Sequence, residues 1–169
     1  MHKAVGTTRS FAIMGAASAS LPASIPLRAK DLEVPVEGLL TSIPLLFFGL
    51  LMGIVITPLI SSRIGSNRQV KIALIIQAIG VFGIGFSTSQ NLFVISAFVL
   101  GLGFGQLEVL ITSILRITSE LVGKALTRIG AFLAFSAFLT PLLLLAAESI
   151  ANKKLVFLFI VLMSGRVAF

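Results

Sequence analysis

Apolar residues dominate the chain from Gly38 to Ile150, and charged or turn-forming clusters interrupt them roughly every 20 to 30 residues. Each apolar stretch has about the length that an α-helix needs to cross ~30 Å of hydrocarbon at ~1.5 Å per residue. The pattern predicts an all-α integral membrane protein, a bundle of about six transmembrane helices. The predicted spans are approximately 10–27, 38–60, 70–86, 92–115, 126–147 and 155–169.

The two ends of the chain fit this pattern least well. We expect residues 1–9 to be a cytoplasmic amino terminus and residues 10–169 to form one transmembrane bundle. The sixth span should be truncated, because the stretch from Leu155 to Arg166 gives only ~18 Å of helix.

Residues 1–30 allow three interpretations. Lys3 and Arg9 precede a small-residue apolar run, and no acidic residue occurs before Asp31. Such a segment is typical of a cleaved signal peptide or of an organelle transit peptide. We favour a first transmembrane helix, kinked at Pro22, whose small side chains allow close approach of other helices.

The basic residues predict an orientation. When alternate hinges are counted, most lysines and arginines fall on one side. The other side holds only Arg28, Lys30, Lys153 and Lys154. Because positive charge is retained on the cytoplasmic side, the amino terminus is expected in the cytoplasm. The predicted location is the cell membrane, crossed several times.

Composition excludes several other classes of protein. The sequence is 57% hydrophobic and 11% charged, with a mean hydropathy of +1.11. It has no cysteine, and its one histidine is His2. Thiolate metal sites, histidine triads and haem sites therefore lack their ligands, and we expect no catalytic residues, no metal, no cofactor and no enzyme activity.

The net charge of +7 does not predict a nucleic-acid partner. The basic residues lie in short hinges and do not form a stripe with aromatic platforms, which is the pattern that nucleic-acid binding requires.

Polar residues inside the predicted spans are the candidate functional residues. Glu108 lies ~12 Å along a helix from the basic hinge at Arg116, within the hydrocarbon. A carboxyl group there is costly unless it is paired, solvated or protonated, so it is a candidate for proton coupling or contact with a polar or cationic substrate. The alternative is a packing role, with a hydrogen bond to Thr112. Gln106 and Gln77 are weaker candidates for the same pathway, since amides also hold helices together.

Gly101 and Gly105 form a G-x-x-x-G spacing in the fourth span. Because no strand precedes it, this spacing predicts close helix packing and not a dinucleotide site.

The hinge after the second span resembles a known signature. It runs from Pro58 to Arg68 and resembles the major facilitator superfamily motif G-x-L-x-D-R-x-G-R-K between the second and third helices. Arg63 and Gly65 match the Arg and the second Gly of the motif, and Arg68 supplies a downstream cation. Ser62 stands at the position of the Asp, so the ion pair of the family's cytoplasmic latch is in doubt. An ordinary basic hinge without a gating role is the alternative.

The resemblance covers residues 10–169, which would be the amino-terminal half of a major facilitator fold. The segment from Leu39 to Leu45, together with the hinge, looks most like the cyanate and nitroimidazole transporter group. The resemblance implies alternating-access transport of a small solute, possible proton coupling, and Arg63, Gly65 and Arg68 as a cytoplasmic gating hinge.

The implied partners are the lipid bilayer, a small-molecule solute and a second six-helix half, in the same gene product or in a separate chain. The alternative function is a truncated, non-transporting membrane protein that acts as a scaffold or a partner subunit.

Overall fold

The described chain is all helical. The computed structural model describes residues 2–118, 122–149, 158 and 160–162. Its helices are α1 (His2–Leu32), α2 (Val36–Leu40), α3 (Ser42–Ile64), α4 (Ser66–Phe86), α5 (Gln90–Thr118) and α6 (Val122–Ser149). The described residues contain no strand. The expectation of an all-α fold is therefore confirmed.

Within the described part of the chain, three stretches of helix are long and apolar enough to cross a membrane. They are Val36–Ile64, which joins α2 to α3, then Ser66–Phe86 and Gln90–Ser113. Among the described residues of α6, the comparable apolar stretch is Leu133–Ala146. α1 is a helix of 31 residues that begins well before residue 10 and contains Pro22 and Pro26. The predicted sixth span, 155–169, lies largely outside the described residues.

Short connections separate the helices. Glu33 has a positive φ of 53°, and the backbone N–H of Val34 donates to the carbonyl of Ala29, which closes α1. Pro35 then begins α2 with an extended backbone. The predicted second span corresponds to α2 and α3, which meet at Thr41. The backbone of Thr41 is helical (φ −60°, ψ −18°), and its hydroxyl donates to the carbonyl of Gly38. The helical stretch continues beyond residue 60 to Ile64.

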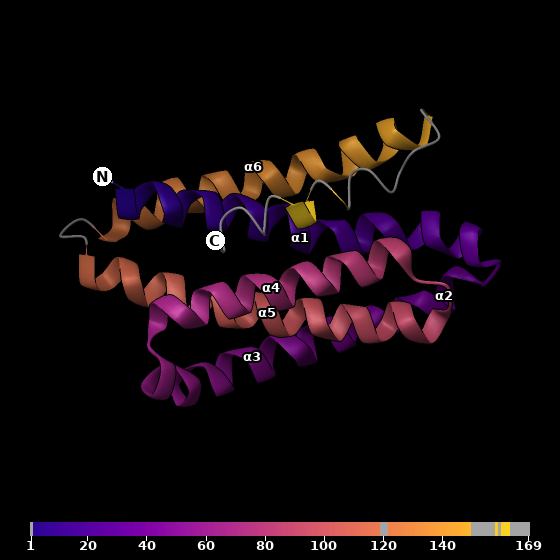
Figure 1. Cartoon of the computed structure of the whole chain (residues 1–169). Coiled ribbons are helices and arrows are strands. Elements are labelled where there is room, and N and C mark those ends of the chain that lie inside the picture. The colour runs from indigo at the N-terminus through magenta and orange to yellow at the C-terminus, as the bar shows by residue number, and fades with distance from the viewer. Residues whose placement is uncertain (1, 119–121, 150–157, 159, 163–169) are drawn as a thin grey trace.

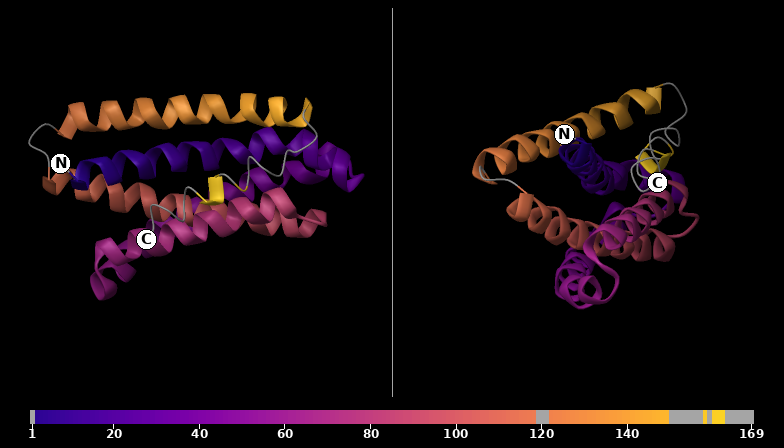
Figure 2. Two further views of the ribbon diagram at one scale, coloured as in Figure 1. Left: turned by 45° about the horizontal axis from the view of Figure 1, so that its top comes forward. Right: turned by 60° about the vertical axis from the view of Figure 1, so that its left-hand side comes forward.

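The helices pack as two groups. α5 lies against both α3 and α4, whereas α1 packs mainly along α6. Figures 1 and 2 show α1 and α6 side by side, with α3, α4 and α5 on the other side of α1. Contacts between the two groups are fewer. They include an apolar cluster shared by Met14 of α1, Leu74 of α4 and Leu107 of α5.

Glycines bring α3 and α5 close together. A Cβ added to Gly101 would collide with the carbonyl oxygen of Leu46, and one added to Gly105 would collide with that of Leu50. Gly49 and Gly53 of α3 meet the α5 backbone in the same way. Each helix thus presents a G-x-x-x-G face to the other, and the backbones approach as small residues allow.

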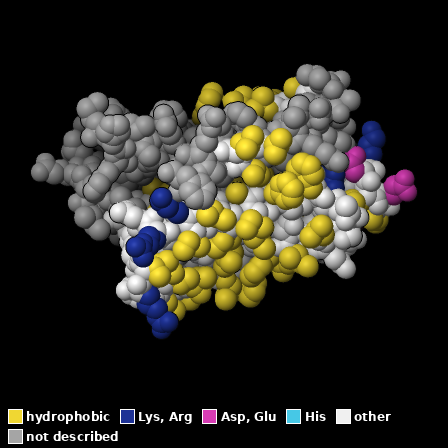
Figure 3. All heavy atoms as spheres, in the orientation of Figure 1, with side chains coloured by type: hydrophobic (Ala, Val, Ile, Leu, Met, Phe, Trp, Pro, Cys, Tyr) yellow, Lys and Arg dark blue, Asp and Glu magenta, His cyan; other side chains and the backbone are white. Residues whose placement is uncertain are grey.

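Apart from Glu108, the described charged side chains lie at opposite ends of an apolar surface. Arg63, Arg68 and Lys71 are exposed around the α3–α4 hinge, and Glu33 and Glu37 are exposed near the start of α2. Figure 3 shows basic groups alone at one end, acidic groups together with basic groups at the other, and a broad hydrophobic surface between them. The exposed apolar side chains of α3 include Phe47, Phe48, Leu51, Met52, Val55 and Leu59.

Candidate functional site

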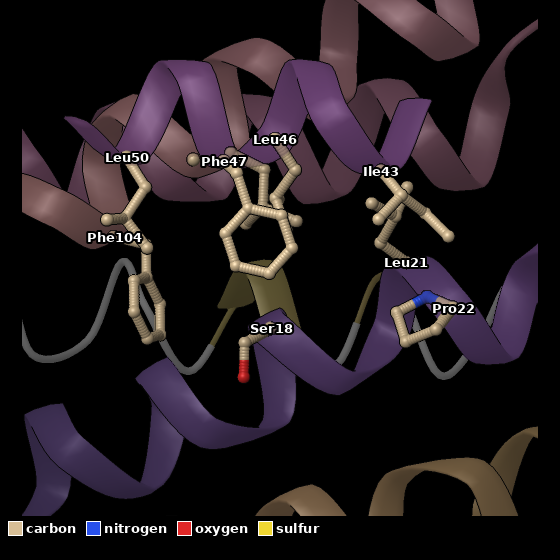
Figure 4. A pocket seen from close by; sticks show the side chains of 10 residues that line it. Ser18, Leu21, Pro22, Ile43, Leu46, Phe47, Leu50 and Phe104 are labelled. Atoms are coloured by element: carbon tan, nitrogen blue, oxygen red, sulfur yellow. The ribbon is translucent and has the colours of Figure 1, made fainter. Parts of the chain in front are cut away.

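A cavity of about 340 Å³ lies between α1, α3 and α5. Figure 4 shows the side chains of α3 and Phe104 directed into the space beside α1. Only apolar atoms are exposed on its wall. The residues that line it are Ser18, Leu21, Pro22, Ile43, Leu46, Phe47, Leu50, Leu100, Gly101 and Phe104.

Helical periodicity explains how these residues come together. Ile43 is followed by lining residues three, four and seven positions later, which places all of them on one face of α3. Ser18 is polar, yet its hydroxyl donates to the carbonyl of Gly15 in its own helix at 2.9 Å. On α5, Gly101 brings the helix close to α3, and Phe104 borders the cavity one turn further on.

Glu108 follows the last cavity-lining residue of α5 by one helical turn. It follows Phe104 by four residues and Gly101 by seven, so all three share one helix face. Its side chain is exposed. No basic group among the described side chains lies within ion-pair distance of it. The expected role in a substrate or proton pathway stays a prediction.

The two predicted glutamines are buried, unlike Glu108. Gln106 is 2% exposed and Gln77 is fully buried. The backbone of Gln77 lies against Gly103 of α5, and neither amide atom of Gln77 has a hydrogen-bond partner among the described groups. The structure therefore does not bring Gln77 and Glu108 to one exposed face.

Gln69 was missed by the sequence analysis. It is also fully buried, and both atoms of its amide lack a described partner. It lies eight residues before Gln77 on α4, about 12 Å along the helix. The spacing of the two glutamines on the face that contains Ala73 could have identified it.

The α3–α4 hinge has the backbone that its glycine suggests. Gly65 ends α3 with φ 80°, a conformation that glycine adopts without steric cost. The hydroxyls of Ser61 and Ser66 are 3.0 Å apart across the hinge. The hydroxyl of Ser62 donates to the carbonyl of Leu59 in its own helix. Arg63 and Arg68 are both exposed, and their gating role stays a prediction.

Arg28 connects the end of α1 to the end of α4, on the side of the molecule opposite the α3–α4 hinge. In the sequence, Arg28 contributes only a charge that sets orientation. Its side chain is 7% exposed and pairs with Asp31 at 2.9 Å. It also donates to the backbone carbonyl of Ser87 and to the Ser87 hydroxyl at 3.1 Å. The ion pair at i,i+3 is visible in the sequence, but the contact with Ser87 is not.

No metal centre is evident in this structure. Among the side chains that the structure describes, no group of three or more His, Cys, Asp or Glu residues is placed to hold a metal ion. The carboxylates at the start of α2 are exposed and separate from the cavity.

Comparison with known proteins gives no family assignment. No protein-family model matches the chain, and no curated protein matches it either.

Proposed function

We propose that this chain is half of a secondary transporter of the major facilitator type. It spans the cell membrane several times, with its amino terminus in the cytoplasm. It moves a small solute by alternating access, in which two helix bundles rock around a site at the membrane midplane. The resemblance of the α3–α4 hinge to the family motif supports this proposal.

The distribution of charge supports the membrane setting. Apolar surface covers the helices between a basic hinge, which contains Arg63 and Arg68, and an acidic end, which contains Glu33 and Glu37. This is the arrangement that a bilayer imposes, with lysines and arginines retained on the cytoplasmic side.

The cavity between α1, α3 and α5 is the observation on which the transport proposal mainly rests. It lies among the apolar lengths of the helices, and Glu108 is placed one turn beyond it on α5. An ionisable residue in a membrane span indicates a substrate or ion pathway by default. A cavity with one carboxylate a helical turn beyond it can hold a solute within the membrane.

A second half completes the proposed transporter. Alternating access requires two bundles, and this chain supplies one. Its partner is either a further part of the same gene product or a separate chain. The exposed apolar residues of α3, such as Phe47 and Leu51, are available for lipid or for that partner.

Reconstitution of the native complex tests the proposal. The tagged chain is isolated from its own membranes in mild detergent with whatever it binds, and the mass of the complex is determined. The complex is then placed in vesicles, and solute entry is followed by stopped-flow light scattering. The panel contains small neutral, anionic and cationic solutes, and empty vesicles are the control.

Two results decide between the functions. Transport predicts a complex roughly twice the 17.8 kDa of this chain or larger, and faster entry of at least one solute. A species of 17.8 kDa that admits no solute faster than empty vesicles contradicts transport. It favours the alternative, a non-transporting scaffold or partner subunit.

A further inference from the structure

We propose that the cavity and Glu108 together bind a hydrophobic organic cation. The inference rests on the proposed function, because it names the substrate class of that transport site. Its three components are an apolar wall, aromatic rings and one neighbouring carboxylate.

The apolar wall selects for a molecule with a large apolar body. Only apolar atoms are exposed in the cavity, and its volume is about 340 Å³. The polar group of Ser18 is already bonded to its own helix. A small hydrophilic solute would lose its water on entry and gain no hydrogen bond in return.

Apolar bulk alone does not provide selectivity in a membrane. Lipid tails are as apolar as leucine, so an uncharged hydrocarbon gains little by leaving them for this cavity. Selective binding therefore requires an electrostatic contact. The rings of Phe47 and Phe104 border the cavity, and aromatic faces attract cations.

Glu108 determines that the bound molecule should carry a positive charge. It lies on the α5 face that carries Gly101 and Phe104, one turn beyond the latter. Helical side chains lean toward the amino terminus of their helix, which for Glu108 is the direction of the cavity. A carboxylate there attracts a bound cation and repels an anion. No described basic group is within ion-pair distance to compete.

Matched probes test the sign of the charge. Tetraphenylphosphonium and tetraphenylborate have the same shape and opposite charges, so the difference in their binding isolates the electrostatic contact. Equilibrium binding to the purified native complex is measured in detergent. We expect tetraphenylphosphonium to bind and tetraphenylborate to bind at least about tenfold more weakly, as expected for a partly exposed charge pair.

A pair of acidic variants tests the role of Glu108. Glu108→Gln removes the charge and keeps the shape of the side chain. Glu37→Gln removes an exposed carboxylate on α2, away from the cavity. We expect Glu108→Gln to weaken tetraphenylphosphonium binding about tenfold, and Glu37→Gln to leave it unchanged.

A pair of aromatic variants tests the cavity itself. Phe47 is 57% exposed and lines the cavity, whereas its neighbour Phe48 is 54% exposed and does not. Both can be changed to alanine without emptying the helical core. We expect Phe47→Ala to weaken tetraphenylphosphonium binding several-fold, and Phe48→Ala to have no effect.

Equal binding of the two probes, or unchanged binding in either Glu108→Gln or Phe47→Ala, overturns the inference. Because binding is measured in detergent, its result is separate from transport. Selective binding supports this site. If, in addition, no solute, tetraphenylphosphonium included, enters vesicles faster than it enters empty ones, transport is contradicted. Faster solute entry without selective binding supports transport and contradicts this site.

Discussion

Arg28 at the end of α1 donates hydrogen bonds to the backbone carbonyl and the hydroxyl of Ser87, which ends α4 59 residues later. The guanidinium is nearly buried, and Asp31 balances its charge from the next turn of α1. A helix end leaves backbone carbonyls without partners, and a buried cation is well suited to satisfy one. This contact joins α1 to the α3–α4–α5 group, where contacts between the two groups are otherwise few.

Replacing Arg28 should loosen that connection. We expect Arg28→Leu to lower the free energy of unfolding by about 2 kcal/mol, because the hydrogen bonds from the guanidinium to Ser87 and the ion pair with Asp31 are lost. Thermal unfolding in detergent measures the change. Lys30→Leu, at an exposed position two residues later, is the control and should have little effect. An equal effect of the two substitutions on stability would contradict a stabilising contact between Arg28 and Ser87.

Replacing a buried amide of α4 should raise the free energy of unfolding, in contrast to the replacement of Arg28. Gln77 and Gln69 are fully buried, and their amide atoms have no described partner. Replacing an unsatisfied buried amide by an apolar side chain of similar size removes a desolvation cost. We expect Gln77→Leu to raise the free energy of unfolding by about 1 kcal/mol. A clear loss of stability in Gln77→Leu would show that the amide has a partner in the folded protein.

Two glycine-to-alanine substitutions should change the stability in opposite directions. In Gly101→Ala the new methyl group meets the carbonyl oxygen of Leu46, whereas a Cβ at Gly130 meets nothing within 4 Å. Overpacking makes Gly101→Ala destabilising by about 1–3 kcal/mol. Gly130→Ala should stabilise α6 by up to about 1 kcal/mol, because alanine favours helix. Melting temperatures of the two variants provide the comparison, and equal shifts would contradict the close packing of α3 and α5.

Replacing the hinge glycine, Gly65, should lower the stability because of its backbone conformation and not because of a steric clash with a neighbour. Gly65 has φ 80°, and a Cβ there has no neighbour within 4 Å. Gly65→Ala should cost about 1 kcal/mol, because L-residues are strained at positive φ. Gly65→Asn should cost at least as much, since ψ is 146° and the tolerance of asparagine for positive φ is limited to the αL region, where ψ is about 30–60°. The two variants are compared by thermal unfolding, and equal stability of wild type and Gly65→Ala would contradict the observed backbone.

The spacing of charged clusters predicted much of the fold because membrane-length helices leave a strong signal. The helices near 70–86 and 92–115 were located within a few residues, as α4 and α5. The second span was predicted over residues 38–60, whereas the helical apolar stretch runs over Val36–Ile64. Hydropathy reports where a segment is apolar but does not give the residue at which a helix begins or ends.

The candidate site was predicted less completely. Glu108 was identified by its position in an apolar span, but the sequence does not give its exposure or the cavity beside it, because both depend on helix packing. Arg28 was missed as a contact because Ser87 is remote in sequence. Gln69 was missed because it lies next to the basic hinge, where a polar side chain is unremarkable.

Accessibility of single cysteines tests the membrane-spanning arrangement most directly. The sequence has no cysteine, so Asn67→Cys, Glu33→Cys and Val55→Cys can each be labelled alone with a membrane-impermeant maleimide. Asn67 and Glu33 are exposed at opposite ends, and Val55 is 64% exposed on the apolar surface of α3. The account predicts labelling of Asn67→Cys only from the cytoplasmic side, of Glu33→Cys only from the outside, and of Val55→Cys from neither. Labelling of Asn67→Cys and Glu33→Cys from the same side, or ready labelling of Val55→Cys, would contradict it.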